Sequence, residues 1–527
     1  MISLLGSLLR QSAIRYPKRI AIEDKKKGIS YKELDVESDV IAFYLLSEGL
    51  KIGGRVGLCT HKSMGGIKTA FGILKAGGVY VPLDPKWPPK RSAFIIDDCQ
   101  IEYLFINSSY VGSLQEVLKF SSSLKCVIFL DNPLEPSSRL LPKSQNIRFL
   151  EKIKKTPIRK FPSLKPDSIV SILYTSGSTD QPKGVVMTQQ AVMEDLIRTL
   201  QLYRLIKKDR YALYFPFSFS PSLYDVFLMV KIGATVCVLP EGTTAFIPSV
   251  KAFLKENKIT FLRIDPKFLI NLTLHGAFKR GELPYLKTVI SNGSKLPLKY
   301  AHSFMDLIPK AKLYNEYAST EALLVTSYLV KKGRASQKEI YLPIGKPARG
   351  VKTFLVDESG NRLAQIEGDE GELYVSSLSL MSGYWNDPET TKDVLFKKPF
   401  TKGYRTVYRT HDIMRIGRNK DYIFLGRSDN IIKTRGYRVS LDEIESVLES
   451  HPAIKEAVVL GVPDEEIENR IKAVVVLKEE HLLNEETIKG FCRDYLAIYM
   501  IPEIIEFRSS LPRTSSGKIN RQALLKA

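Results

Sequence analysis

The amino-acid sequence predicts an α/β protein with a large N-terminal domain and a small C-terminal one. Through about residue 425, short apolar runs alternate with stretches whose apolar residues recur at helical spacing. This alternation indicates parallel-rich sheets covered by helices. A chain of 527 residues is also too long for one hydrophobic core. The clearest predicted strands are 55–58, 80–83, 126–130 and 168–174, and the clearest predicted helices are 64–74 and 192–200.

The pattern changes twice towards the carboxyl end. After Lys346, short apolar runs and turns dominate, at 354–356, 371–375 and 422–425, which predicts a strand-rich subdomain. The last hundred residues combine a helical pattern with two apolar runs, which predicts a small α+β domain. Its predicted elements are a helix at 441–448 and strands at 456–461 and 471–477.

Composition excludes several classes of protein. No apolar run reaches the ~18 residues that a membrane helix needs, so we expect no membrane insertion. The first ten residues predict an amphipathic helix instead of a signal peptide, which favours a cytoplasmic protein. Five scattered cysteines without a CxxC pair argue against a disulfide framework.

The formal charge of +21 raises nucleic-acid binding as an alternative. However, lysines and arginines are spread along the chain, and their densest run, 152–160, lies in a proline-punctuated stretch. No helix-turn-helix, zinc or aromatic-basic signature accompanies that run. We therefore expect no nucleic-acid partner, and interpret the charge as suited to polyphosphate or to an acidic protein.

The segment 174–184, Tyr-Thr-Ser-Gly-Ser-Thr-Asp-Gln-Pro-Lys-Gly, is the most informative one. It follows a predicted buried strand and gathers hydroxyls, a glycine and a lysine. Backbone N–H groups and side-chain donors in such a turn can hold phosphate oxygens. Its spacing differs from the Walker motif. The alternative is a polar surface turn.

This segment resembles the phosphate loop of the adenylate-forming superfamily, which includes acyl-CoA synthetases, adenylation domains of nonribosomal peptide synthetases and luciferases. Further segments resemble family motifs, occur in family order and span nearly the whole chain. Two of them, the 74–84 and 512–518 segments, look closest to amino-acid-adenylation domains. The remaining motif-like segments are 315–321, 371–375, 382–385, 408–412, 426–429 and 433–438.

The resemblance implies an ATP site. Tyr317 would stack on adenine, Asp412 would accept from the ribose hydroxyls, and Arg427 would help to fix that sugar. Thr320 would contact phosphate, and Glu321 would hold Mg²⁺, a cation that prefers oxygen ligands. The phosphate loop would contribute Thr175, Ser176, Gly177, Ser178, Thr179 and Lys183. The adenine pocket would include Gly293, Ser294, Asn315 and Glu316.

Lys518 is the implied catalytic residue of the first step, together with Thr320 and Glu321. A carboxylate that attacks the α-phosphorus approaches another anion, and a lysine ammonium between them offsets that repulsion. By itself, a lysine near the end of the chain would be interpreted as solvated. The resemblance also places a hinge at Asp429, within a 427–431 connector between domains 1–426 and 432–527. The small domain would rotate there, presenting either Lys518 or the 435–438 segment to the site.

The sequence departs from the family pattern at several positions. Asp180 replaces a glycine of the phosphate loop, His411 replaces the glycine before Asp412, and Gln189 or Gln190 stands where histidine is common. Ser220 stands where amino-acid-activating members have an aspartate. A serine cannot supply the negative charge that a buried α-ammonium requires. We therefore do not expect an ordinary α-amino acid to be held in the usual way.

The same alignment predicts the residues around the acid. Arg263 would suit an anionic group of the substrate, and Glu316 an amine. Alternatively, these two buried charges pair with each other. The predicted pocket residues are Ser220, Pro221, Tyr224, Arg263, Ile290, Asn292, Leu324 and Val325.

Together these features predict an AMP-forming acid–thiol ligase that uses ATP and Mg²⁺. It would convert a small carboxylic acid, an amino acid or a related acid, into an acyl-adenylate and transfer the acyl group to the phosphopantetheine of a separate acyl or peptidyl carrier protein. One alternative is an acyl-CoA synthetase that uses free coenzyme A. Another is a binding protein that kept the fold and lost activity.

Overall fold

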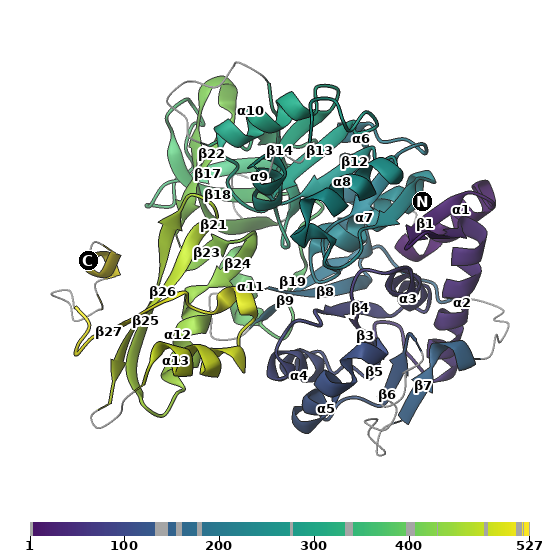
Figure 1. Ribbon diagram of the computed structural model, residues 1–527, viewed down its shortest axis with the longest axis horizontal. Helices are drawn as coiled ribbons and strands as arrows, with labels where there is room; N and C mark the ends of the chain where they lie inside the picture. The colour runs from purple at the N-terminus through teal and green to yellow at the C-terminus, as the bar shows by residue number, and fades with distance from the viewer. Residues whose placement is uncertain are drawn as a thin grey trace.

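The computed structural model confirms the predicted α/β fold (Figure 1). A large body carries the N-terminus, and the small C-terminal unit packs against one side of it. The five cysteines are all free, as expected. Within the part of the chain that is described, no helix has both the length and the apolarity to cross a membrane. The structure describes residues 4–131, 146–153, 161–175, 182–274, 278–331, 341–396, 406–428, 430–478, 483–512, 519 and 521–525.

The first sheet of the large domain has eight strands in the order β19-β9-β8-β4-β3-β5-β6-β7. Its centre is parallel, and the β8–β9 hairpin adds an antiparallel edge. Helices α4 and α5 (Pro89–Asp98 and Val111–Phe120) pack beside each other at this sheet. The strands are β3 Arg55–Cys59, β4 Val79–Leu83, β5 Tyr103–Ile106, β6 Cys126–Phe129, β7 Asn146–Phe149, β8 Ile169–Thr175, β9 Lys183–Thr188 and β19 Gly383–Tyr384.

The second sheet has nine strands in the order β16-β15-β14-β13-β12-β10-β11-β1-β2. Its strands β14, β13, β12, β10, β11 and β1 are parallel neighbours, and the strands at both ends are antiparallel. The strands are β1 Ile20–Asp24, β2 Lys27–Ser30, β10 Arg210–Leu213, β11 Thr235–Val238, β12 Phe261–Ile264, β13 Thr288–Asn292, β14 Lys312–Ser319, β15 Leu323–Leu329 and β16 Lys346–Pro347.

Helices between the two sheets form the largest hydrophobic core. The predicted N-terminal amphipathic helix is α1, whose residues Leu5, Leu8 and Leu9 are buried there. Helices α1, α2, α3 and α7 pack on one another. The helices of this domain are α1 Leu5–Arg15, α2 Tyr31–Ser47, α3 Met64–Lys75, α6 Gln189–Tyr203, α7 Ser220–Ile232, α8 Ile247–Glu256, α9 Pro266–Leu274 and α10 Leu298–Leu307.

Helix α7 illustrates how local sequence positions the site. Pro221 occupies its first turn, where a missing N–H costs nothing, and Gly233 ends the helix at φ +73°. A side chain at Gly233 would meet the Tyr16 ring, with a Cβ only 2.3 Å from Tyr16 Cδ2. Pro221 and Gly233 therefore define the two ends of α7, and Ser220 is its first residue.

The strand-rich subdomain is an antiparallel sheet, as the pattern after Lys346 predicts. Its order is β17-β18-β21-β20, and β22 pairs with the other part of β21. The short helix α11 (Pro388–Val394) contacts β19, β20 and β21. The strands are β17 Lys352–Val356, β18 Glu370–Ser376, β20 Leu395–Phe396, β21 Val407–Ile416 and β22 Tyr422–Arg427.

The small C-terminal unit contains a hairpin, a three-stranded sheet and three helices. The β23–β24 hairpin points towards the large domain, and α14 lies on the far side of the unit (Figure 1). Strand β22 ends at Arg427 and β23 begins at Ile431, while Asp429 lies outside the described residues. The elements are β23 Ile431–Thr434, β24 Tyr437–Ser440, α12 Leu441–Glu449, β25 Ile454–Asp464, β26 Glu468–Leu477, α13 Glu485–Arg493, β27 Ile504–Phe507 and α14 Arg521–Leu525.

A buried ammonium ties α2 to α3. Lys75 Nζ lies 2.6 Å from Asp35 Oδ1 and 2.7 Å from Asp39 Oδ1, and the Lys75 side chain is 3% exposed. Replacing Lys75 by methionine leaves two carboxylates without this partner, one of them buried. We expect the free energy of unfolding to fall by about 3 kcal/mol or more, measured by urea denaturation.

The same two helices supply a matched control. Lys68 on α3 pairs with Glu37 on α2 at 2.7 Å, but Glu37 is 46% exposed. Lys68→Met is expected to change stability by less than about 1 kcal/mol. Equal losses in the two variants would contradict a special role for burial at Lys75.

Candidate active site

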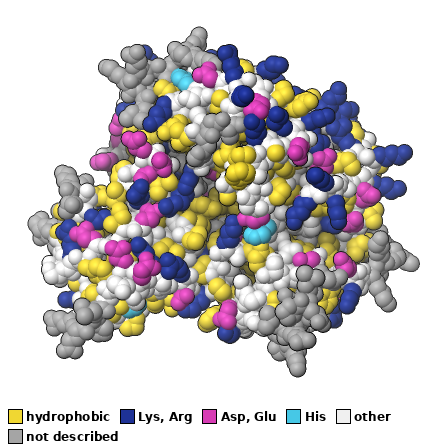
Figure 2. Space-filling model, viewed as in Figure 1, with side chains coloured by type: hydrophobic (Ala, Val, Ile, Leu, Met, Phe, Trp, Pro, Cys, Tyr) yellow, Lys and Arg dark blue, Asp and Glu magenta, His cyan; other side chains and the backbone are white. Residues whose placement is uncertain are grey.

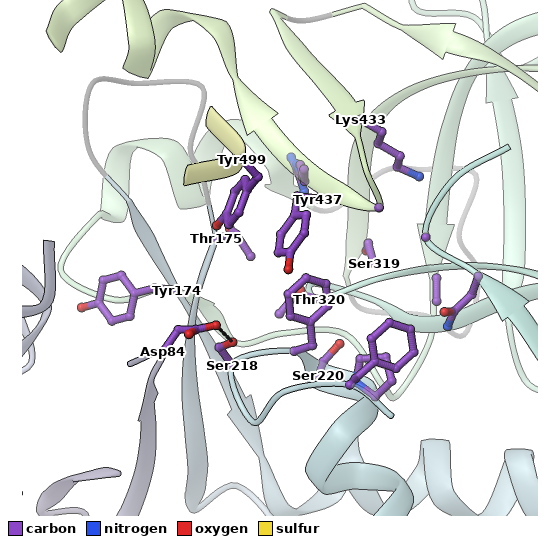
Figure 3. Close-up of a pocket in the computed structure, with 18 of the residues that line it drawn as sticks. Asp84, Tyr174, Thr175, Ser218, Ser220, Ser319, Thr320, Lys433, Tyr437 and Tyr499 are labelled. Atoms are coloured by element: carbon purple, nitrogen blue, oxygen red, sulfur yellow. Dashed lines mark hydrogen bonds between the residues drawn. The ribbon is translucent and has the colours of Figure 1, made fainter. Parts of the chain in front are cut away.

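A cavity of about 1120 Å³, its open mouth included, lies where the two large sheets, the subdomain and the small domain meet (Figure 3). The carboxyl ends of several strands converge on this cavity. Open α/β sheets place their ligand sites at the carboxyl ends of their strands. From the large domain, the lining residues are Asp84, Trp87, Arg91, Tyr174, Thr175, Phe215, Ser218, Phe219, Ser220, Pro221, Asn292, Gly293, Tyr317, Ala318, Ser319 and Thr320. The subdomain and the small domain add Asp412, Arg427, Lys433, Gly436, Tyr437, Arg438 and Tyr499.

Asp412 organises one wall of the cavity. It accepts a hydrogen bond from the Tyr317 hydroxyl and forms an ion pair with Arg427, its cross-strand partner in β22. Burial, and next the Asp412 carboxylate, raise the pKa of Tyr317 well above its usual range. The hydroxyl is therefore a permanent donor near pH 7. The structure brings together three of the residues that the resemblance assigns to adenine and ribose.

The backbone conformation at His411 explains why a histidine can replace the glycine of the family pattern. Its φ is +59°, in the left-handed region that favours glycine. Histidine is among the residues that tolerate this region best. The imidazole Nδ1 lies 3.2 Å from Glu372 Oε1. The position thus keeps the backbone shape that a glycine would give.

The phosphate-loop prediction is only partly described. Thr175 ends β8 at the cavity wall and pairs in register with Lys183, the first residue of β9. Ser176, Gly177, Ser178, Thr179 and the departing Asp180 lie outside the described residues. In the sequence they connect the end of β8, which is at the cavity wall, to the start of β9.

Lys183 itself does not line the cavity. Its ammonium donates to Thr390 Oγ1 at 3.2 Å and lies 3.9 Å from Asp387. Burial lowers the pKa of Lys183, and the Asp387 carboxylate opposes that change. In this conformation, the lysine is therefore engaged with α11.

Glu321, next to Thr320, is fully buried. Its Oε1 accepts from Arg438 Nη1 at 2.8 Å and from the Tyr384 hydroxyl at 3.1 Å. Among the described residues, its Oε2 has no hydrogen-bond partner. Burial alone would raise the pKa of Glu321, but the Arg438 guanidinium holds it below the usual range. An ionised carboxylate oxygen beside a threonine hydroxyl fits the oxygen preference of Mg²⁺.

Another part of the cavity lining is mostly apolar with a few polar groups. Of the residues predicted for the acid pocket, Ser220, Pro221 and Asn292 line the cavity, together with Phe215 and Phe219. The lining here contains hydroxyl, amide and aromatic groups in place of the aspartate of amino-acid-activating relatives. This part of the lining suits an acid with a largely apolar body.

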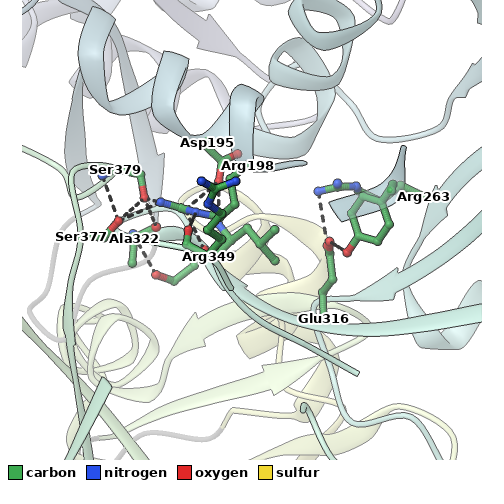
Figure 4. Close-up of polar contacts among 11 residues, drawn as sticks. Asp195, Arg198, Arg263, Glu316, Ala322, Arg349, Ser377 and Ser379 are labelled. Atoms are coloured by element: carbon green, nitrogen blue, oxygen red, sulfur yellow. Dashed lines mark hydrogen bonds and ion pairs between the residues drawn. The ribbon is translucent and has the colours of Figure 1, made fainter. Parts of the chain in front are cut away.

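Three predicted pocket residues, Arg263, Glu316 and Tyr224, lie behind this wall instead of on it. Arg263 Nη1 lies 3.4 Å from Glu316 Oε2, and Arg263 Nε lies 3.3 Å from Asp225 (Figure 4). Glu316 also accepts from Tyr203. The alternative that Arg263 and Glu316 pair with each other is therefore correct in this structure. The hydroxyls of Tyr224 and Ser171 form a hydrogen bond of 2.8 Å, so Tyr224 also lies behind the wall.

Hydrogen bonds to or from the backbone hold other residues that were predicted for the site but do not line the cavity. The Leu324 N–H donates to Asp195 and its carbonyl accepts from Arg198 Nη1, so this strand is fixed to helix α6 (Figure 4). The Asn315 amide donates to the Pro343 carbonyl at 2.9 Å. Four predicted residues lie in the core or at another surface: Ile290 and Val325 are fully buried, Asn315 is 1% exposed, and Ser294 borders a separate small cavity.

Two aromatic residues that sequence reasoning missed, Trp87 and Tyr499, line the cavity. Tyr499 stacks on Tyr437 with ring centroids 3.8 Å apart, and Phe219 meets Tyr437 edge-on at 5.2 Å. Trp87 lies just before α4 and Tyr499 in a short 3-10 helix, where no periodic pattern marks them. Their spacing in the sequence carried no signal of a shared site.

Lys518 lies outside the described residues. Nearby, Ile519 packs against the small-domain cluster that includes Val458 and Leu524, and Arg521 donates to Glu445 of α12 at 2.7 Å. Arg438 and Lys433, both on the β23–β24 hairpin, bring small-domain charges to the site, and Arg438 pairs with Glu321. Of the two segments expected to alternate, the structure presents the 435–438 one.

The fold and this cavity define a nucleotide-dependent ligase of two domains. Residues 9–385 match the family model for AMP-binding enzymes, and residues 443–518 match the model for the C-terminal domain of AMP-binding enzymes. The chain belongs to the AMP-binding enzyme family.

Individual relatives agree with this membership. Zwittermicin A synthase ZmaJ from Bacillus cereus is 30% identical over 531 residues, which cover 99% of this chain and 95% of that protein. Seven longer synthases and synthetases also match, but the chain spans only 6% to 45% of their length.

Solved structures share the fold. The amide bond synthetase McbA from Marinactinospora thermotolerans superposes with a TM-score of 0.86 at 22% identity, over 99% of both chains. The artificially fused adenylation-PCP di-domain NpsA-ThdA from Klebsiella oxytoca has a TM-score of 0.81 at 20% identity, over 96% of this chain and 94% of that one.

The Asp412 wall yields a prediction for nucleotide binding. Asp412→Asn keeps the shape but removes the charge that orders Tyr317 and Arg427. We expect ATP affinity to fall about tenfold or more, because hydrogen bonds to charged groups contribute 1.5–3 kcal/mol. Isothermal titration calorimetry measures this change. Asp393→Asn, an exposed carboxylate on α11, is the control and should bind ATP like the wild type.

Proposed function

We propose that this enzyme uses ATP to convert a small carboxylic acid into an acyl-adenylate, releases pyrophosphate, and transfers the acyl group to a phosphopantetheine thiol. The observation that carries the proposal is one cavity whose lining combines two chemically different groups of residues. The Tyr317–Asp412–Arg427 group suits a nucleoside, and the Phe215–Ser220–Asn292 group suits an acid. A reacting carboxylate and an α-phosphate would meet between them, beside Thr320.

Each wall has a defined task in the first step. Tyr317 would hold adenine, and Asp412 with Arg427 would hold the ribose. Thr175 and the connection after it would bind the outer phosphates. A Mg²⁺ bound at Glu321 would neutralise phosphate charge and favour pyrophosphate as the leaving group. Lys518 would then bridge the acid and the nucleotide during attack.

That role of Lys518 requires a different domain orientation from the present one. Here the β23–β24 hairpin occupies the site, and Arg438 bonds Glu321. We propose that adenylation uses the rotated state, with Asp429 as the hinge, and that the present orientation serves acyl transfer. The domain boundaries 1–426 and 432–527 follow from this motion.

A second cavity supports a thiol route to the acyl group. Its volume is about 880 Å³, and it shares Asp84, Ser218 and Tyr437 with the first. Its lining combines the cations Lys62, Lys86 and Arg435 with the carboxylates Asp84, Glu241 and Asp265, so groups of both signs would face a pantetheine arm. Lys86 Nζ lies 2.6 Å from Glu241 Oε1. A carrier protein is the favoured acceptor because one structural neighbour joins an adenylation domain to a PCP. Free coenzyme A is the alternative.

We propose no nucleic-acid partner. On the face that Figure 2 shows, lysines and arginines lie among acidic and apolar side chains. We place the reaction in the cytoplasm, where ATP and carrier proteins are available.

Acid-dependent ATP–pyrophosphate exchange tests the proposal. A panel of hydroxy, aryl, dicarboxylic and amino acids should contain at least one acid that supports exchange. Lys518→Ala is expected to lower that exchange by about 100-fold or more, since charge stabilisation at the reacting centre is lost. Lys455→Ala, on the exposed surface of the small domain, is the control. Absence of exchange with every acid would refute the function.

Ser220 provides a prediction on substrate choice. Ser220→Asp supplies a carboxylate in the part of the cavity that we propose for the acid, where an α-ammonium could pair with it. We expect exchange with α-amino acids to rise at least about tenfold relative to the corresponding hydroxy acids. Ser220→Asn, of similar size but neutral, should not raise it. Equal effects of both substitutions would show that size, and not charge, governs this position.

A further inference from the structure

One ion pair at the boundary of the two domains is almost completely buried. Arg91 on α4 of the large domain donates to Glu443 on α12 of the small domain. The two side chains are 2% and 3% exposed. No part of the predicted chemistry uses this pair.

The surroundings of the pair come from both domains. The Trp87 ring lies 5.4 Å from the Arg91 guanidinium, and Met500 Sδ lies 3.9 Å from Arg91 Nη1. Beside it, the Lys90 ammonium sits 3.7 Å over the Tyr495 ring. One hydrophobic cluster contains Trp87 and Ile95 of the large domain as well as Val439, Leu441 and Ile444 of the small domain. Water is thus excluded from the pair only while the domains are in this orientation.

The electrostatics of the pair favour a contact that can be released. Burial raises the pKa of Glu443, and the Arg91 guanidinium opposes that effect. Within the part of the chain that the structure describes, Glu443 Oε2 has no hydrogen-bond partner, so only one oxygen of this carboxylate is hydrogen-bonded there. The attraction between two buried charges roughly offsets their desolvation, whereas either charge alone would be strongly unfavourable. Such a contact selects one orientation without making it irreversible.

The pair also sits close to the element that enters the active site. Ser440 ends β24 and caps α12 by accepting from the Glu443 N–H at 3.2 Å. Tyr437 and Arg438, on the same hairpin, line the cavity. Holding Glu443 against α4 therefore holds the hairpin in the site.

We propose that Arg91 and Glu443 are positioning residues that hold the small domain in its acyl-transfer orientation. Their contact forms when the hairpin enters the cavity and breaks when the domain rotates for adenylation. This inference rests on the proposed function for the two states, but the pair and its burial are properties of the fold itself.

Another pair that crosses the same boundary provides a matched control. Lys299 on α10 lies 3.9 Å from Glu465 at the end of β25, and the two side chains are 64% and 93% exposed. Both pairs join a large-domain cation to a small-domain glutamate. The two pairs differ in burial. Glu443→Gln therefore removes a buried ion pair, and Glu465→Gln removes an exposed one.

Intrinsic fluorescence tests the orientation without any substrate. The chain has two tryptophans, and Trp385→Phe leaves Trp87, which is 8% exposed at the boundary. In this background we expect Glu443→Gln to move the Trp87 emission to longer wavelength, because the boundary opens to water. Glu465→Gln should leave it unchanged. An unshifted spectrum in the Glu443→Gln protein would overturn the proposal.

The two half-reactions test the consequence in the otherwise unaltered protein. The acid with the highest pyrophosphate exchange serves as substrate, and pantetheine serves as the thiol. We expect Glu443→Gln to slow acyl transfer about tenfold or more while exchange stays within about twofold. Glu443→Asp, which keeps the charge, should recover most of the transfer rate, and Glu465→Gln should match the wild type.

The outcomes separate this inference from the proposed function. Parallel losses in exchange and transfer would assign Glu443 a general structural role and overturn the inference. Unchanged transfer would overturn it as well. If the wild-type protein supports no exchange with any acid, the proposed function fails, while the Trp87 measurement still decides whether the pair holds the domains.

Discussion

The arrangement of the site depends on one buried carboxylate, that of Asp412. It accepts a hydrogen bond from the hydroxyl of Tyr317, which lies in the nine-stranded sheet. It also forms an ion pair with Arg427 on the neighbouring strand of the subdomain. These contacts join two sheets that share no backbone pairing at this point. Because a buried charge must be paired, neither partner can be displaced without a large cost. The wall that we propose for the nucleoside is therefore ordered by contacts within the protein itself.

A recurring device at the domain boundary is an arginine facing a buried glutamate. Arg438 bonds Glu321 inside the site, and Arg91 bonds Glu443 beside it. In both pairs one carboxylate oxygen lacks a hydrogen-bond partner among the described residues. Pairs of this kind give orientation more than stability. The rotation that we propose for the small domain would require contacts that are specific and reversible.

Charge pairing also explains why the acid pocket differs from its predicted form. Arg263 is shared between Asp225 and Glu316, and the latter also binds Tyr203. Once these groups satisfy one another, they form a wall behind the cavity and are not available to a substrate. The residues left at the surface of that wall are Ser220, Pro221 and Asn292, which are neutral. Selectivity for the acid then depends on shape and hydrogen bonding.

The sequence alone determined the layers of the fold and the identity of the nucleotide wall. Apolar runs of strand length marked β3, β4, β6 and β8, since a buried parallel strand needs apolar residues on both faces. Motif resemblance also marked Tyr317, Asp412 and Arg427, which belong to segments with distinctive composition. Only the tertiary structure decided which side chains reach the cavity. Trp87 and Tyr499 come from segments far apart in the sequence, and Arg263 pairs with carboxylates on other elements instead of facing the cavity. Burial and charge pairing depend on neighbours in space, and the spacing of residues along the chain does not encode those neighbours.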